Sequence, residues 1–279
     1  MPIHDQGYRR YLGTRDAIGR SWQVMTRAGV MSVVSKRVFL GMMLFAWAPF
    51  VVRVVQFYFA TTLAQASFLA PSGETFREFL DQQGIWVFFV TIYVGAGLIA
   101  NDRRANALQL YLSKPMTSAE YIAGKLAILF LFLVAVTFLP AMLLLITQAL
   151  LAGNLTFTRN NLYLVPAITL YSLAQVLLAA TTMLALSSLS KSSRFVAVMY
   201  AGLFFFTTAL FQTLRGITGR STFAWLSPGA SLQQLGDVIF RLEPRYQLSP
   251  AIAGLAVLVM IAGSMLILMR RVRGVEIVT

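Results

Sequence analysis

Long apolar runs alternate with short polar segments along the whole chain. A helix of about 20 apolar residues crosses the ~30 Å hydrocarbon layer of a membrane, and most of the runs reach that length. No run alternates with period two, so we expect helices rather than strands. The pattern predicts six spans, at residues 38–60, 85–100, 121–152, 162–189, 195–212 and 249–269.

The polar segments divide the chain into an N-terminal segment at 1–37, one transmembrane domain at 38–269 and a basic tail at 270–279. Spans five and six are separated by a long stretch whose apolar part, 231–240, is too short to cross a membrane. Ser227, Pro228 and Gly229 interrupt it. It predicts short re-entrant helices in the outer interface, or, on the simpler interpretation, only an aromatic belt.

Composition and charge support a membrane protein and suggest its orientation. Hydrophobic residues make up 58% of the chain and charged residues 12%, with a net charge of +13. Six spans with both ends inside place 16 of the 23 Lys and Arg residues on the cytoplasmic side, as the positive-inside rule favours. We therefore expect a multi-pass protein of the inner (cytoplasmic) membrane with both termini in the cytoplasm, and no nucleic-acid partner. Without cysteine, the chain has no thiolate chemistry.

A charged, turn-rich segment, residues 101–120, separates spans two and three. Asp102, Arg103 and Arg104 end span two abruptly. Leu108 and Leu112 then recur at helical spacing and predict one face of a short amphipathic helix.

Proline and a capping motif limit this short helix. Pro115 ends it, because proline disfavours helical geometry at the preceding residue. Thr117 and Glu120 form the pattern of a capping box that starts the next long helix. Two interpretations stay open: an ordinary loop whose arginines set orientation, or a docking helix for a soluble partner.

The order Gly97-x-Ile-x-x-Asp-Arg-Arg-x-x-x-Leu-x-Leu-Tyr-Leu-Ser-Lys-Pro-Met-x-x-x-Glu-Tyr-x-x-Gly-Lys125 resembles the signature after the second membrane helix of ABC-2 type transporter permeases. The resemblance covers about a tenth of the chain, and the six-span layout agrees with that family. It implies that residues 101–120 are a coupling loop, whose short coupling helix docks in a groove of a separate ATPase subunit. The residues it assigns to docking and helix geometry are Asp102, Arg103, Arg104, Leu108, Tyr111, Leu112, Ser113, Pro115 and Glu120.

The resemblance also implies partners and cofactors. Two permease copies, identical or related, would enclose a pathway for export, and each would dock one cytoplasmic ABC ATPase subunit, two in all. ATP and Mg²⁺ would bind to the ATPase and not to this chain. ATPase closure would then move the coupling helix as a rigid lever.

The N-terminal segment predicts an interfacial helix. Ile18, Trp22 and Met25 fall on one face, whereas Arg20 and Arg27 point the opposite way. The alternative is a polar tail with a chance periodicity. The resemblance favours an elbow helix that enters span one and touches the ATPase.

Arg53, Tyr93 and Phe205 are our candidates for the translocation pathway. A charge inside a span is costly, so Arg53 either extends to the outer head groups or lines the pathway. Phe205 lies in a run of three phenylalanines, which more often face lipid or pack internally. Gln175, near the centre of span four, is more often an interhelical contact than a ligand.

The chemistry absent from the sequence narrows the function. It contains no phosphate-binding loop, no zinc-protease motif and no nucleophile elbow, so we do not expect an enzyme. The acidic residues lie almost entirely in predicted loops, which argues against an ion relay within the spans. The alternative functions are a membrane-embedded lipid-modifying enzyme or a non-transport scaffold.

Overall fold

The computed structural model describes residues 21–62, 70–107 and 116–272, and every regular element within these ranges is a helix. Six helical segments are long and apolar enough to cross a membrane, which confirms the number of predicted spans. The chain is therefore a multi-pass membrane protein. The six segments are Arg37–Thr62, Gly73–Arg104, Ser118–Leu151, Leu164–Leu189, Ser193–Thr218 and Pro250–Arg271.

Several spans consist of more than one helix. The first three are built from α2 (Arg37–Ala46) with α3 (Ala48–Thr62), from α4 (Gly73–Val90) with the π-helical turn η2 (Thr91–Gly95) and α5 (Ala100–Arg104), and from α7 (Ser118–Val136) with α8 (Phe138–Leu151). The last three are α10 (Leu164–Leu189), α11 (Ser193–Thr218) and α13 (Pro250–Arg271). Four shorter helices are α1 (Ser21–Val34), α9 (Thr156–Asn160), the 3-10 helix η3 (Thr222–Leu226) and α12 (Pro228–Ile239).

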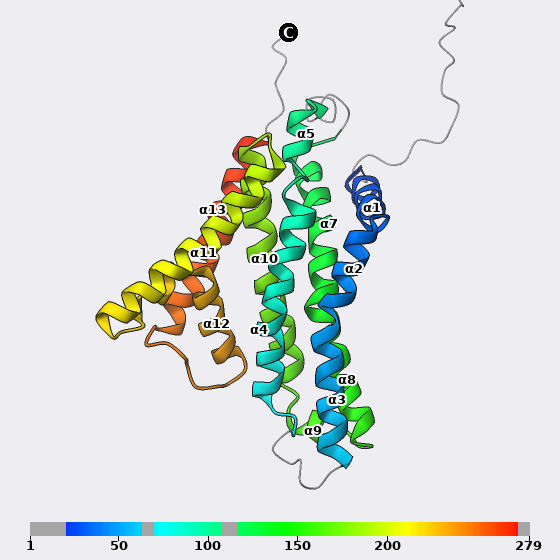
Figure 1. The fold of residues 1–279 in the computed structure, drawn as a ribbon, viewed down its shortest axis with the longest axis vertical. Coiled ribbons are helices and arrows are strands. Elements are labelled where there is room, and N and C mark those ends of the chain that lie inside the picture. Colours follow the sequence, from blue (N-terminus) through cyan, green and yellow to red (C-terminus); the bar gives the residue numbers. More distant parts are fainter. Residues whose placement is uncertain (1–20, 63–69, 108–115, 273–279) are drawn as a thin grey trace, which may run out of the picture.

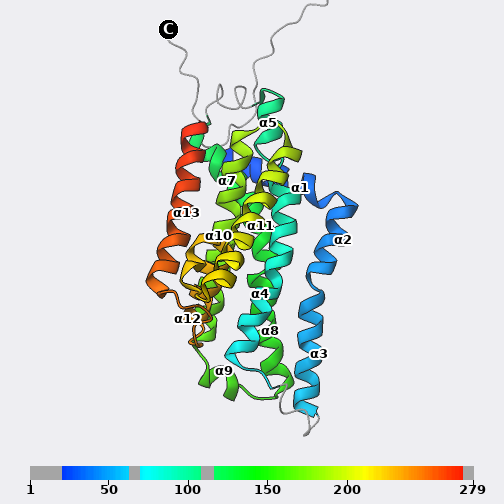
Figure 2. The same ribbon diagram turned by 60° about the vertical axis from the view of Figure 1, so that its left-hand side comes forward.

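The helices form an elongated bundle with two distinct ends (Figure 1). We call them the α5 end, where α1, α5 and the C-terminal end of α13 lie, and the α9 end, where α9 and the first turn of α4 lie. Helix α11 leans away from the bundle as it leaves the α5 end, and α12 lies in the space beneath it (Figures 1 and 2).

Helix α10 is the centre of the packing. It contacts α4, α7 and α13 and is the most buried of the six spans. The first span and α11 and α13 are mostly exposed, as expected for helices that face lipid or another protein. Gly95 in η2 permits close approach to α10, because a Cβ atom there would lie 2.5 Å from Met183 Cγ.

The predicted start of span two, at residue 85, is wrong. Helix α4 begins twelve residues earlier, at Gly73, with Ser72 and Thr75 forming a capping box. The charged residues that resembled a loop lie inside the helix, where Arg77 is completely buried. The ion pairs of Arg77 with Asp81 and Asp237 compensate the cost of burying its charge.

Local chemistry interrupts and ends span three. Its helix is interrupted at Thr137, next to the carbonyl that the ring of Pro140 would obstruct. Helix α8 ends at Leu151, and Gly153 just beyond it adopts a left-handed conformation with φ of 65°. The capping box of Thr117 and Glu120 starts α7 as expected, with Glu120 N 3.2 Å from Thr117 Oγ1.

The stretch between spans five and six differs from its prediction. Span five continues to Thr218 and stops at Gly219, which has φ of 66°. Ser227 and Pro228 do not interrupt a helix but begin α12, as its N-cap and first residue. Proline suits that position because its missing N–H has no partner in a first turn.

Candidate functional site

The structure describes four of the predicted docking residues, Asp102, Arg103, Arg104 and Glu120, and these lie at the α5 end. Asp102 is in contact with α7: Tyr121 donates its hydroxyl to Asp102 Oδ2 at 2.7 Å, and Lys125 Nζ lies 2.7 Å from the same oxygen. Lys125 is itself buried. Asp102 therefore fixes α5 to α7.

Arg103 and the neighbouring backbone fix α5 to α10. The Arg103 guanidinium donates to the carbonyl of Ser188, while Arg104 is exposed. Ser187 accepts from the amides of Ile99 and Ala100 at 3.2 and 3.0 Å, and donates to the carbonyl of residue 96 at 3.0 Å. These bonds satisfy backbone groups where the second span changes from η2 to α5.

Some predicted docking residues lie outside the described residues: Leu108, Tyr111, Leu112, Ser113 and Pro115. The same holds for Arg20 of the N-terminal helix. Trp22 and Arg27 are described, and both are exposed on α1. Helix α1 packs against α7, where Thr26 Oγ1 donates to the carbonyl of Gly124 at 3.3 Å.

The three candidate pathway residues do not come together. Arg53 on α3 forms an ion pair with Glu78 at 3.1 Å and donates to Gln56 at 2.9 Å. Tyr93 stacks on Phe39, with ring centroids 6.0 Å apart. Of the three, only Phe205 lines the cavity described below.

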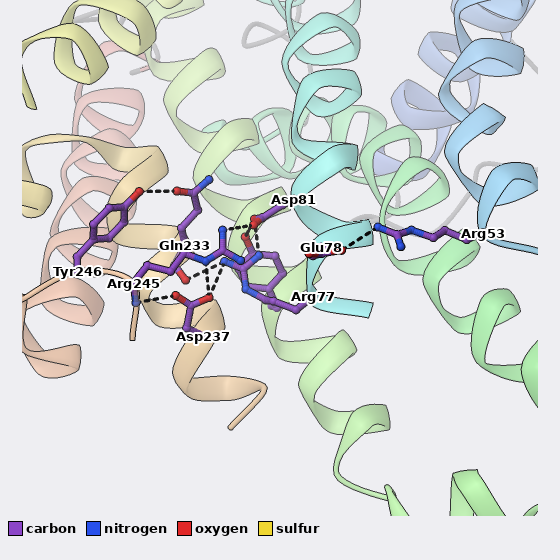
Figure 3. A network of polar contacts seen from close by, with 9 residues as sticks. Arg53, Arg77, Glu78, Asp81, Gln233, Asp237, Arg245 and Tyr246 are labelled. Carbon is purple, nitrogen blue, oxygen red and sulfur yellow. Dashed lines mark hydrogen bonds and ion pairs between the residues drawn. The ribbon is translucent and has the colours of Figure 1, made fainter. Parts of the chain in front are cut away.

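A network of charged side chains joins three helices towards the α9 end (Figure 3). Arg77 of α4 pairs with Asp81 one turn along the same helix and lies 3.3 Å from Asp237 of α12. Arg245, in the segment after α12, bridges the same two carboxylates at 2.9 and 3.1 Å. Tyr171 of α10 donates to Asp81 at 3.0 Å.

Further hydrogen bonds secure α12 to the same network. Arg77 donates to the carbonyl of Gln233 at 2.8 Å, and the Tyr246 hydroxyl donates to the Gln233 side chain at 2.9 Å. Gln234 is completely buried and donates to the carbonyls of Tyr246 and Leu248. These bonds hold α12 against α4 and against the segment that follows α12.

Burial shifts the acid–base properties of this network. It raises the pKa of Asp237 above its ordinary value, although the charges of Arg77 and Arg245 oppose the shift. The pKa of Arg245 is also raised, because the attraction of Asp81 and Asp237 outweighs the opposing effect of burial. Burial likewise raises the pKa of Tyr246. With two arginines and two aspartates, the ion-pair cluster has no net formal charge.

A cavity of about 470 Å³ lies beside this network, lined by residues of α4, α10, α11 and α12 and by Met260 of α13. Its walls are mainly apolar, with an aromatic surface from Phe88, Phe204 and Phe205. Asp81 and Gln233 also line it.

Two buried polar side chains of α10 line the cavity, and each has one atom that makes no hydrogen bond. Gln175 Oε1 and Thr182 Oγ1 have no partner among the described residues. If Gln175 makes the interhelical contact that the sequence predicts, this oxygen does not take part in it among the described residues. Because an unpaired buried polar atom costs free energy, such atoms call for a functional explanation.

The sequence reasoning missed the network and the cavity. It treated Arg77 and Asp81 as loop charges, although their spacing of four residues is typical of a helical ion pair. The pairing of Arg77 with Asp237 spans 160 positions, and no local pattern indicates it. Within the described ranges, no group of three or more metal-binding side chains occurs.

Comparisons with known proteins give no match, either to a protein-family model or to a curated protein.

Proposed function

We propose that the chain is the permease subunit of an ATP-binding cassette exporter of the ABC-2 type. The α5 end faces the cytoplasm, where residues 101–120 dock a separate ATPase subunit as a coupling helix. Two permease copies, each with one ATPase, form the transporter, and ATP with Mg²⁺ binds to the ATPases. In this proposal α1 is the elbow helix, and η3 with α12 is the re-entrant segment between spans five and six.

The observation that carries the proposal is the attachment of α5 to both neighbours. The second span continues 32 residues from Gly73 to Arg104, about 48 Å at helical rise and more than the hydrocarbon requires. Its end is fixed to α7 by Asp102 and to α10 by Arg103. A load on the following residues is thereby transmitted to both central helices, as a lever driven by an ATPase requires.

The charge distribution supports the orientation. Basic side chains of the described residues at the α5 end include Arg27, Lys36, Arg37, Arg103, Arg104, Lys125, Lys191, Arg194, Arg270 and Arg271. By the positive-inside rule, this end belongs in the cytoplasm. The localisation proposed is the inner membrane, with both termini cytoplasmic.

The lipid-modifying enzyme is the less favoured alternative. The carboxylates nearest the cavity, Asp81 and Asp237, are both engaged by arginines. A general base needs a carboxylate free to accept a proton from its substrate. A scaffold, in turn, has no need for unpaired polar atoms in a cavity.

Co-purification tests the proposal. The chain, solubilised from its native membrane, should retain an ABC-type ATPase subunit, and the double variant Leu108→Asp, Leu112→Asp should lose it while still inserting in the membrane. The matched control is Leu155→Asp, Leu162→Asp, which alters two exposed leucines near the α9 end. Retention of the ATPase by the first variant, or equal loss by both, would contradict docking at the coupling helix.

A further inference from the structure

The size and the mainly apolar lining of the cavity suit the apolar part of a small molecule. Its volume of about 470 Å³ falls within the range of roughly 300–1,000 Å³ typical of small-molecule sites. Ile85, Phe89 and Phe205 line the cavity, and each is more than half exposed. Because all three belong to membrane-spanning helices, the cavity is open to the surrounding lipid.

The polar atoms that line the cavity indicate which hydrogen-bonding groups a ligand would need. Gln175 is 6% exposed and its Oε1 atom, an acceptor, has no partner among the described residues. Thr182 is 8% exposed, and its hydroxyl is likewise unpaired. Seven residues apart on α10, the two positions are separated by about 10 Å. A ligand with a donor at one point and an acceptor further along would satisfy both.

The charged side chains at the cavity do not favour either a cationic or an anionic ligand. Asp81 lines it, but one carboxylate oxygen accepts from Tyr171 and pairs with Arg77, and the other pairs with Arg245. A cationic ligand would find no free carboxylate. An anionic ligand would find no free cation, because Arg77 is fully buried and Arg245 bridges two aspartates.

We propose that this cavity binds an uncharged amphipathic lipid with a hydroxyl-bearing head group, of the monoacylglycerol class. One hydroxyl donates to Gln175 Oε1, and an ester or second hydroxyl oxygen accepts from Thr182. The acyl chain lies against Phe88, Phe204 and Phe205. The identification of this lipid as cargo rests on the proposed permease function, whereas its binding does not require the ATPase.

Photocrosslinking tests the binding. The chain is placed in nanodiscs without an ATPase and exposed to a monoacylglycerol with a diazirine in its acyl chain, and crosslinking is competed with unlabelled lipids. Unlabelled monoacylglycerol should compete, whereas a fatty acid and an alkyltrimethylammonium ion of equal chain length should compete poorly. Crosslinks should fall on the cavity walls of α4 and α11.

Variants identify the atoms responsible. Gln175→Leu and Thr182→Val should each weaken binding about five- to tenfold, because each removes one hydrogen bond to the ligand. Gln148→Leu and Ser172→Ala are matched controls: both remove buried side chains with an unpaired atom, but neither residue lines the cavity. Neither control should change binding.

The outcomes separate this inference from the proposed function. Non-saturable crosslinking, tighter competition by the cationic or anionic lipid, or equal weakening by Gln148→Leu and Gln175→Leu would overturn the inference and leave ATPase docking unaffected. Saturable binding in nanodiscs, combined with failure of the chain to co-purify an ATPase from its native membrane, would support the lipid site and contradict the permease function.

Discussion

The guanidinium of Arg77 on α4 lies 3.3 Å from the carboxylate of Asp237 on α12, and both side chains are almost completely buried. This ion pair joins a long central helix to the short helix after span five (Figure 3). Gly236 makes the approach possible, since a Cβ atom there would lie 2.5 Å from Arg77 Nε.

The two members of this pair should differ in their contribution to stability. Arg77→Met should lower the free energy of unfolding by about 3–5 kcal/mol, because it leaves the buried carboxylate of Asp237 and the partly buried one of Asp81 with one arginine. Asp237→Asn should cost less, about 1 kcal/mol, since Arg77 keeps its pair with Asp81. Unfolding in a denaturing detergent series measures both, with the exposed Arg220→Met as control. A smaller effect of Arg77→Met than of Asp237→Asn would contradict the network as described.

Stability should also depend on pH through Asp237, which faces Arg77 and Asp81 of α4 and Arg245 of the following segment. Its pKa is raised by burial, so the folded protein binds this proton at a higher pH than the unfolded chain does. The contribution of Asp237 to stability therefore falls as the pH rises from its unfolded pKa, about 3.9, through its folded pKa. The difference in unfolding free energy between the wild type and Asp237→Asn, measured over that interval, gives the slope. A slope of opposite sign would show that the arginines dominate over burial.

Ser187 should stabilise the junction between η2 and α5. Ser187→Ala leaves two amides, of Ile99 and Ala100, without their acceptor and should cost about 1–3 kcal/mol. Hydrogen exchange at those two amides should accelerate. Ser172→Ala is the control on the same helix, because Ser172 is equally buried and its Oγ has no partner among the described residues. Unchanged exchange in Ser187→Ala would show that the junction is held by other contacts.

The orientation can be tested with single thiols, because the natural chain contains no cysteine. Ala105→Cys at the α5 end and Thr156→Cys in α9 are both at exposed positions. In intact cells a membrane-impermeant maleimide should label Thr156→Cys, whereas Ala105→Cys should react only after the membrane is opened. The reverse pattern would place the α5 end outside and exclude ATPase docking there.

The sequence predicted the features of the fold that depend on local chemistry. The six apolar runs and the capping box at Thr117 depend on neighbouring residues, and both predictions are confirmed. The break near Pro140 and the left-handed Gly153 after α8 likewise depend on local residues. The start of α4 was missed because its polar residues resemble a loop unless their partners are known. Those partners, Asp237 and Arg245, are more than 150 residues away.

In the candidate sites, too, local patterns were predictable from the sequence and long-range contacts were not. The motif at the α5 end singled out Asp102 and Arg103 as docking residues. It did not indicate that Asp102 pairs with Lys125 or that Arg103 donates to the carbonyl of Ser188. The cavity is formed by five helices, and only Phe205 among the predicted pathway residues lines it. Whether a buried glutamine such as Gln175 has a partner depends on that three-dimensional packing.

The most direct test of the permease proposal asks whether ATP on a docked ATPase changes the cavity. Leu203→Cys places a single thiol in the cavity wall, and its rate of reaction with a maleimide is measured in the complex with the ATPase, with and without ATP. If an ATPase drives this chain through its coupling loop, ATP should change the rate several-fold, and the change should vanish when Leu108→Asp and Leu112→Asp are added. An identical rate with and without ATP, while the attached ATPase hydrolyses ATP, would contradict the account.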